Sequence, residues 1–136
     1  MVAKQPPAAK KFFTPQEADA MLPLVRSIVK DISELAHSVR DRHERLTRLK
    51  SSGKSLVPEA QLEEEQAVLE HDSERLQECV EELTDLGVEI KDLFTGLVDF
   101  PCWKDGREIH LCWKLGEPRL GWWHEVNAGF AGRRPL

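Results

Sequence analysis

Histidine, cysteine and carboxylate side chains collect in the last third of the chain, among all four tryptophans. The residues of this set are Asp99, His110, Cys112, Glu117, His124 and Glu125. Thiolate, imidazole and carboxylate groups together are ligands that suit zinc or iron. The set contains neither a C-x-x-C nor an H-E-x-x-H pair, so its spacing alone does not define a metal site. Metal binding is the first of three interpretations that the segment allows.

Two other interpretations use the same region differently. Trp103 and Trp123, beside polar groups, could stack a flat or apolar ligand or form a surface for a protein partner. Alternatively, the tryptophans build the core of a small sheet and His124 is a buried histidine with satisfied hydrogen bonds. In that case His110 and Glu125 form an ordinary cross-strand pair. The residue types alone leave all three interpretations open.

Two weaker chemical signals lie in the same sequence. Cys112 could form a nucleophilic pair with His110 or His124, but two positions along a strand place the His110 and Cys112 backbones roughly 6–7 Å apart. Glu34 and His37 have the Glu-x-x-His spacing of two-metal helical bundles, and a homodimer would supply the second pair. Both flank the apolar seam of their helix, so we expect them to be exposed. Cys79 and Cys102 are typical of core cysteines.

The segment that carries the candidate site predicts a small sheet. After Gly96 the apolar residues alternate, and Asp105-Gly106 is a hairpin turn signal. A second turn is predicted at 116–119. The sequence therefore predicts a three-stranded antiparallel meander over 97–126, with strands near 97–103, 108–115 and 120–126.

Centring both turns gives a predicted register. On the first hairpin it pairs Asp99 with Cys112. On the second it pairs Cys112 with Trp123 and His110 with Glu125. Strand alternation then separates two faces. The predicted core face holds Val98, Phe100, Cys102, Ile109, Leu111, Trp113, Leu115, Leu120, Trp122, His124 and Val126. The predicted polar face holds Asp99, Pro101, Trp103, His110, Cys112, Lys114, Trp123 and Glu125. A slip of one residue would exchange the faces of a strand.

Two helices are predicted to precede this sheet. Thr14, Pro15 and Glu17 form a helix start with a capping box, and apolar residues then recur at heptad spacing. The predicted helices cover 13–50 and 58–95, joined by a loop at 51–57. As an antiparallel hairpin, they bring Arg42 to Glu65 and Asp72 in the seam. The fold class is α+β in a single domain over 13–136, with a flexible tail at 1–12 and an irregular tail at 127–136.

Composition and charge restrict the partners. The chain has 136 residues and a formal net charge of -5. Residues 59–92 carry thirteen Asp and Glu against two basic residues, which argues against nucleic acid as a partner. No stretch approaches the roughly 18 apolar residues of a membrane span, and the N-terminus lacks the apolar part of a secretory signal. We expect a cytoplasmic protein without a disulfide framework, since the three cysteines are odd in number.

Several short segments share a pattern with a known family. They are Gly96–Pro101, Gly106–Arg107, Leu111–Trp113, Gly116–Glu117, Trp123–Glu125 and Gly129–Arg133. With Phe13-Thr14, Glu17-Ala18 and Leu22-Pro23, they resemble small bacterial proteins known as domain of unknown function 2203. The resemblance implies a compact protein of this size and supplies no activity. The matching positions with reactive groups are Asp99, Cys112, Glu117, His124, Glu125 and Arg133, whereas His110 is not part of the pattern.

Two function hypotheses result. The first is a cytoplasmic binding or assembly module that dimerises, because a lone hairpin leaves helix faces without a partner. Its sheet would bind a ligand or protein through Trp103, Trp123 and Arg133. The second is a zinc- or iron-binding protein, with hydrolytic or redox activity as an option. Its expected ligands are Cys112, His124 and Glu125, with Asp99 and Glu117 as further candidates.

Overall fold

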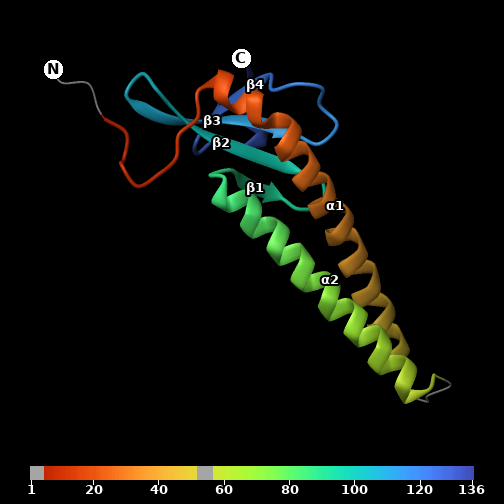
Figure 1. Cartoon of the computed structure of the whole chain (residues 1–136). Helices are drawn as coiled ribbons and strands as arrows, with labels where there is room; N and C mark the ends of the chain where they lie inside the picture. The colour runs from red at the N-terminus through yellow and green to blue at the C-terminus, as the bar shows by residue number, and fades with distance from the viewer. Residues whose placement is uncertain (1–4, 52–56) are drawn as a thin grey trace.

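A computed structural model of the chain describes residues 5–51 and 57–136. Two helices, α1 (Pro15–Ser51) and α2 (Glu59–Asp85), precede a five-stranded antiparallel sheet, so the α+β class is confirmed (Figure 1). The strands are β1 (Glu89–Asp92), β2 (Leu97–Lys104), β3 (Arg107–Lys114), β4 (Trp122–Glu125) and β5 (Arg134–Pro135), with a short 3-10 helix at Phe130–Gly132. Most of the loop predicted at 51–57 lies outside the described residues.

The start of α1 follows the sequence signal. The Glu17 backbone N–H donates to Thr14 Oγ1 at 3.1 Å, and the Thr14 N–H donates to Glu17 Oε1 at 3.0 Å. This reciprocal pair is the capping box, and it satisfies backbone donors that a helix leaves without partners at its first turn. Pro15 takes the first helical position, where its missing N–H costs nothing.

The first half of α1 packs on one face of the sheet. Val25 and Val29 are fully buried in the same cluster as Phe100, Leu111 and Trp113. In Figure 1 this part of α1 crosses the sheet, and the rest of the hairpin extends away from it. The hydrophobic core therefore lies between α1 and the sheet, at one end of the molecule.

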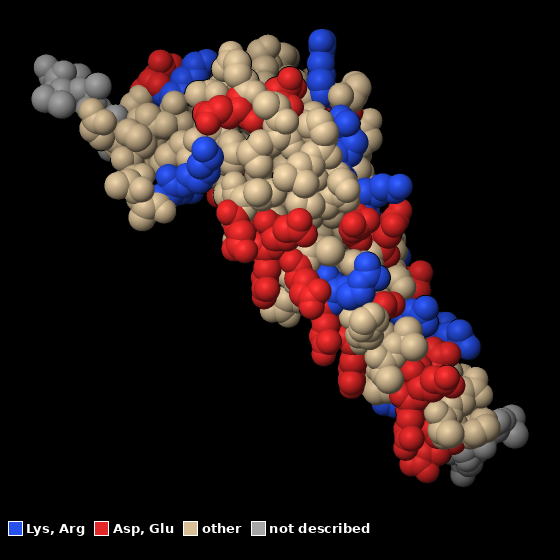
Figure 2. Space-filling model, viewed as in Figure 1, with Lys and Arg blue, Asp and Glu red and all other residues tan. Residues whose placement is uncertain are grey.

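The far half of the hairpin has few buried apolar side chains and several ion pairs between its helices. Of the described apolar residues between Ala36 and Leu83, only Leu46 and Leu69 are buried. The predicted seam ion pair is confirmed: Arg42 Nε lies 3.2 Å from Asp72 Oδ2 and its Nη1 lies 3.9 Å from Glu65 Oε2. Figure 2 shows acidic side chains gathered along this hairpin, over α2. Part-exposed pairs of this kind contribute only about 0–1 kcal/mol each.

The prediction that the second helix continues to residue 95 was wrong, because α2 ends at Asp85. Gly87 has φ +91, and its N–H donates to the Thr84 carbonyl while the Val88 N–H donates to the Leu83 carbonyl. These two bonds are a Schellman ending, which needs a left-handed residue and so favours glycine. The chain then turns into β1, whose one apolar residue, Ile90, continues the heptad of α2 and also fits a strand.

The sheet order is β1-β2-β3-β4-β5, so the predicted meander forms its centre and gains a strand on each edge. The first hairpin has the predicted register, with Asp99 opposite Cys112. Its turn residues Asp105 and Gly106 both have positive φ, at 53° and 77°, as a two-residue type I′ turn requires. The tail predicted to be irregular supplies β5, which pairs with β4.

The predicted register of the second hairpin was wrong by one residue. Cys112 lies opposite Trp122, and His110 lies opposite His124. The connection between β3 and β4 is not symmetric: a tight turn, closed by the Glu117 N–H on the Lys114 carbonyl at 3.0 Å, is followed by bends at 118–119 and two further residues before β4. His124 and Trp122 therefore share a face with Cys112, whereas Trp123 and Glu125 belong to the face toward α1.

No helix in residues 5–51 and 57–136 is long and apolar enough to cross a lipid bilayer.

Candidate metal centre

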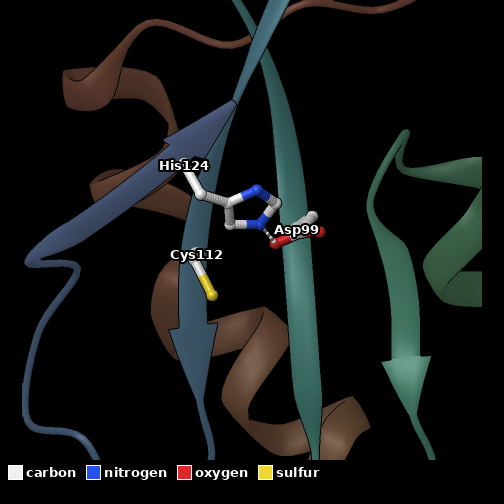
Figure 3. Close-up of side chains that lie close together, drawn as sticks. All are labelled: Asp99, Cys112 and His124. Carbon is white, nitrogen blue, oxygen red and sulfur yellow. Dashed lines mark hydrogen bonds and ion pairs between the residues drawn. The ribbon is translucent and has the colours of Figure 1, made fainter. Parts of the chain in front are cut away.

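Three potential metal ligands converge on the sheet face that points away from α1. Asp99, Cys112 and His124 come from the neighbouring strands β2, β3 and β4, and Figure 3 shows their side chains directed toward one another. One carboxylate oxygen, the thiol sulfur and one ring nitrogen all lie within 4.8 Å of each other. The residues are 3%, 0% and 2% exposed. The group is therefore shielded from water and supplies one oxygen, one sulfur and one nitrogen.

The ring of His124 is held in one orientation by both of its nitrogens. Nδ1 lies 2.7 Å from the backbone carbonyl oxygen of Glu125, and Nε2 lies 2.9 Å from Asp99 Oδ1. Because a carbonyl oxygen only accepts, Nδ1 must carry a hydrogen. Nε2 then faces an acceptor and needs a proton or a metal ion on that side. Most metal-binding histidines show this arrangement, with the second nitrogen donating to a carbonyl or carboxylate.

Asp99 is held as a carboxylate at the centre of this network. Burial raises its pKa, but hydrogen bonds from His110 and His124 outweigh burial, so the pKa lies below its ordinary value. Its Oδ1 faces His124 and its Oδ2 lies 3.3 Å from His110 Nδ1. The side chain therefore offers a negative charge to whatever cation lies between the strands.

Cys112 is a protonated thiol in the protein without metal. Burial raises its pKa to about 12, and the nearby Asp99 carboxylate acts in the same direction. Reactive cysteines have lowered pKa values, so this thiol does not meet the condition for a free nucleophile. A bound divalent metal would displace the proton, because a coordinating thiol is deprotonated outright.

His110 belongs to an adjoining group instead of pairing with Cys112. Its Nε2 lies 2.8 Å from Glu108 Oε2, and a second cluster of possible ligand atoms joins Glu89, Glu108 and His110. Burial lowers the pKa of His110, but hydrogen bonds to Asp99 and Glu108 outweigh burial and raise the pKa overall. The Lys10 ammonium also reaches Glu108 Oε2, at 2.7 Å.

Two of the predicted carboxylate ligands do not join the group. Glu125 lies on the α1 side of the sheet, where Arg107 Nε donates to its Oε1 at 2.7 Å. Glu117 lies in the β3–β4 loop, where Arg133 Nη2 donates to its Oε2 at 2.6 Å. Each carboxylate is already paired with a guanidinium. Glu125 lies on the α1 side because the register of the second hairpin differs by one residue from the predicted register.

The predicted binding surface of Trp103 and Trp123 is also divided. Trp103 lies on the same face as Asp99, with its ring 5.4 Å from that of Phe12, whereas Trp123 lies on the opposite face and packs against the core. The third member, Arg133, lies 4.7 Å above the ring of Trp122. The structure therefore does not bring the two tryptophans together as one surface.

The helix candidates stay apart from the sheet site. His37 Nδ1 lies 2.7 Å from the Ser33 carbonyl oxygen, and Glu34 pairs with Lys30. Cys102 is buried, as expected for a core cysteine, whereas Cys79 is only partly buried.

Sequence reasoning found Asp99, Cys112 and His124 but did not place them together. It also missed Glu89 and Glu108 as neighbours of His110. Strand alternation could have found Glu108, which is two residues from His110 on the same strand. Glu89 had no such signal, because its segment fits a helical heptad.

Comparisons with known proteins add a family but no activity. Neither the curated proteins nor the solved structures contain a match to this chain. A family model described as "Uncharacterized conserved protein (DUF2203)" matches residues 11–136, which include both helices, the whole sheet and every candidate ligand. The chain belongs to this family.

Proposed function

We propose that the protein binds a zinc or iron ion through Asp99, Cys112 and His124. The observation that carries this proposal is the convergence of three different ligand types in a buried position, with the His124 ring already oriented by a backbone carbonyl. Thiolate, imidazole and carboxylate form the donor set expected for zinc or ferrous iron, whereas magnesium and calcium prefer oxygen alone.

The number of ligands favours a centre that also performs chemistry. Structural zinc sites use four protein ligands, whereas catalytic sites use three and leave one position for water or substrate. The described residues supply three. A metal ion there would lower the pKa of a bound water and polarise a bound carbonyl or phosphoryl group. Because the three residues are at most 3% exposed, we propose a hydrolytic reaction only together with an opening of the segments that cover this face.

Metal content measured on protein purified without a polyhistidine tag tests the proposal. We expect about one zinc or iron ion per chain, and loss of the ion in Cys112→Ser and in His124→Ala. Cys79→Ser and His43→Ala are matched controls, because they remove the same residue types outside the cluster, and both should keep the ion. A cobalt-substituted sample should show thiolate-to-metal charge transfer that Cys112→Ser abolishes.

Two results would contradict metal binding by these three residues. Wild-type protein without metal, even after anaerobic incubation with ferrous iron or with zinc, would overturn the proposal. Metal that persists in both Cys112→Ser and His124→Ala would place it elsewhere. Circular dichroism of each variant separates loss of ligands from loss of the fold.

We also propose that the hairpin assembles with a second copy of the chain in the cytoplasm, with no role in nucleic-acid binding. A partly exposed groove at the base of the hairpin is lined by Val39, Leu76, Leu93 and Phe94, and such apolar side chains favour contact with a partner helix. Sedimentation equilibrium tests this, and a monomer at micromolar concentration would contradict it. Phe94→Ala removes an apolar side chain of this groove that is 39% exposed, so it should weaken the dimer while the Arg42–Asp72 pair inside the hairpin stays intact.

A further inference from the structure

A second group of possible ligands lies beside the first on the same sheet face. Glu89 on β1 is directly opposite Asp99, and Glu108 and His110 on β3 continue the face past Cys112. Two carboxylate oxygens and one ring nitrogen of these residues lie within 4.8 Å of one another. The His110 side chain is 5% exposed, whereas those of Glu108 and Glu89 are 21% and 34% exposed. The group therefore runs from the buried network to the surface.

The hydrogen bonds of His110 require a positive charge within this group. Asp99 Oδ2 lies 3.3 Å from Nδ1 and Glu108 Oε2 lies 2.8 Å from Nε2. Ionised carboxylates only accept hydrogen bonds. With Nδ1–H donating to Asp99, Nε2 and the Glu108 oxygen are two acceptors face to face, and either a proton or a metal ion must lie between them. The Asp99–His110 pair also matches the carboxylate–histidine arrangement that orients metal ligands.

The Lys10 side chain shows that this place attracts a cation. Its ammonium nitrogen lies 2.7 Å from Glu108 Oε2 and 3.7 Å from Glu89 Oε2. A surface groove lined by Lys10, Gly87 and Glu89, among others, borders the group. The lysine side chain is itself 41% exposed, so it can swing away into solvent. Lys91 is a second competitor, because its ammonium nitrogen lies 2.8 Å from Glu89 Oε1 and its side chain is 43% exposed. A soluble ion therefore has a path to these carboxylates and would displace two mobile ammonium groups.

We propose that Glu89, Glu108 and His110 bind a second divalent cation of the manganese or ferrous-iron class, in competition with Lys10 and Lys91. Two carboxylates and one imidazole form a harder ligand set than that of the first centre, which includes a thiol. Asp99 would link the two metal positions, because it would bind the first ion through Oδ1 and orient His110 through Oδ2. The proposal of two linked ions therefore rests on the function proposed above. Binding at the second position alone does not depend on Cys112.

Titration with Mn²⁺, followed by electron paramagnetic resonance, tests the second position on the full chain after loading with Zn²⁺. We expect one bound Mn²⁺ per chain, with affinity at least about tenfold weaker in Glu108→Gln and in Glu89→Gln. Lys10→Ala should bind Mn²⁺ about two- to fivefold more tightly, since it removes one part-exposed competing charge. Lys11→Ala is the matched control, because that ammonium pairs with Glu17.

The outcomes separate the two proposals. Mn²⁺ binding that is lost in Glu108→Gln but kept in Cys112→Ser supports the second position, even if zinc does not bind. If zinc is lost in Cys112→Ser and His124→Ala, and Glu108→Gln, Glu89→Gln and Lys10→Ala leave Mn²⁺ binding unchanged, the second position is overturned and the first is preserved. Failure to bind Mn²⁺ at millimolar concentration in both wild type and Lys10→Ala also overturns it.

Discussion

At the centre of the sheet, its two faces are buried to the same degree but consist of opposite kinds of side chain. Toward α1, β2 and β3 present Phe100 and Leu111, each 0% exposed. On the other face, the neighbouring residues of the same strands are Asp99 and Cys112, which are 3% and 0% exposed. His124 lies beside them and is 2% exposed. One face excludes water with hydrocarbon, whereas the other holds a carboxylate and imidazoles in a connected hydrogen-bond network.

This difference bears on why the polar face exists. Removing an ionised group from water costs several kcal/mol, and its hydrogen bonds and charge partners recover this only in part. Apolar residues of similar volume often give equal or greater stability. The apolar face is therefore sufficient to explain how the sheet packs, and the polar face calls for a functional explanation. Polar groups of this kind concentrate at sites of binding and catalysis.

The largest effect is expected from truncation on the apolar face. Phe100 is fully buried and its ring meets that of Phe13 edge to face at 5.4 Å. We expect Phe100→Ala to lower the free energy of unfolding by about 3–5 kcal/mol, because it removes apolar contacts and leaves a cavity. Urea denaturation in the presence of a chelator measures this effect.

The control for this variant is Phe130→Ala, since Phe130 is 45% exposed. It should lose much less stability than Phe100→Ala. Equal losses in the two variants would contradict the placement of the core between α1 and the sheet.

The sequence was sufficient for features that depend on local signals. The capping box of Thr14 and Glu17 predicted the start of α1, and Asp105-Gly106 predicted the first hairpin with its register. In each case a few adjacent residues determine the backbone geometry. The end of α2 was missed although Gly87 is a local signal, because Ile90 and Leu93 beyond it continue the heptad, whereas in the structure Ile90 belongs to β1.

The candidate site was harder to predict because it depends on the register of a long connection. No local sequence signal determines at which residues β3 ends and β4 begins. A shift of one residue in the β3–β4 register moves His124 from one face of the sheet to the other. The ligand types were recognisable from the sequence, whereas their meeting point was not. Glu125 shows the same error in reverse, because the step that brings His124 to Asp99 takes Glu125 away to Arg107.

A smaller effect is expected on the polar face, from the variant Asp99→Asn in metal-free protein. The amide keeps one acceptor but loses the charge that holds His110 and His124, so we expect a loss of about 1.5–3 kcal/mol, the range for hydrogen bonds to charged groups. Although burial raises the pKa of Asp99, its histidine hydrogen bonds lower it below the ordinary value. The stabilisation is therefore present above the unfolded-state pKa and is lost as the pH falls through the folded-state pKa.

Glu125→Gln provides the matched comparison, because Glu125 is a carboxylate on the same sheet that is paired with Arg107 at the surface. Water and salt screen this pair, so the variant should lose the least stability of all, and the loss should vanish in 1 M salt. Asp99→Asn should keep most of its loss at that salt concentration, since its partners are buried. Equal, salt-sensitive losses in both variants would mean that water reaches Asp99, and the polar face would then lack the shielding that a metal centre with a buried thiol ligand requires.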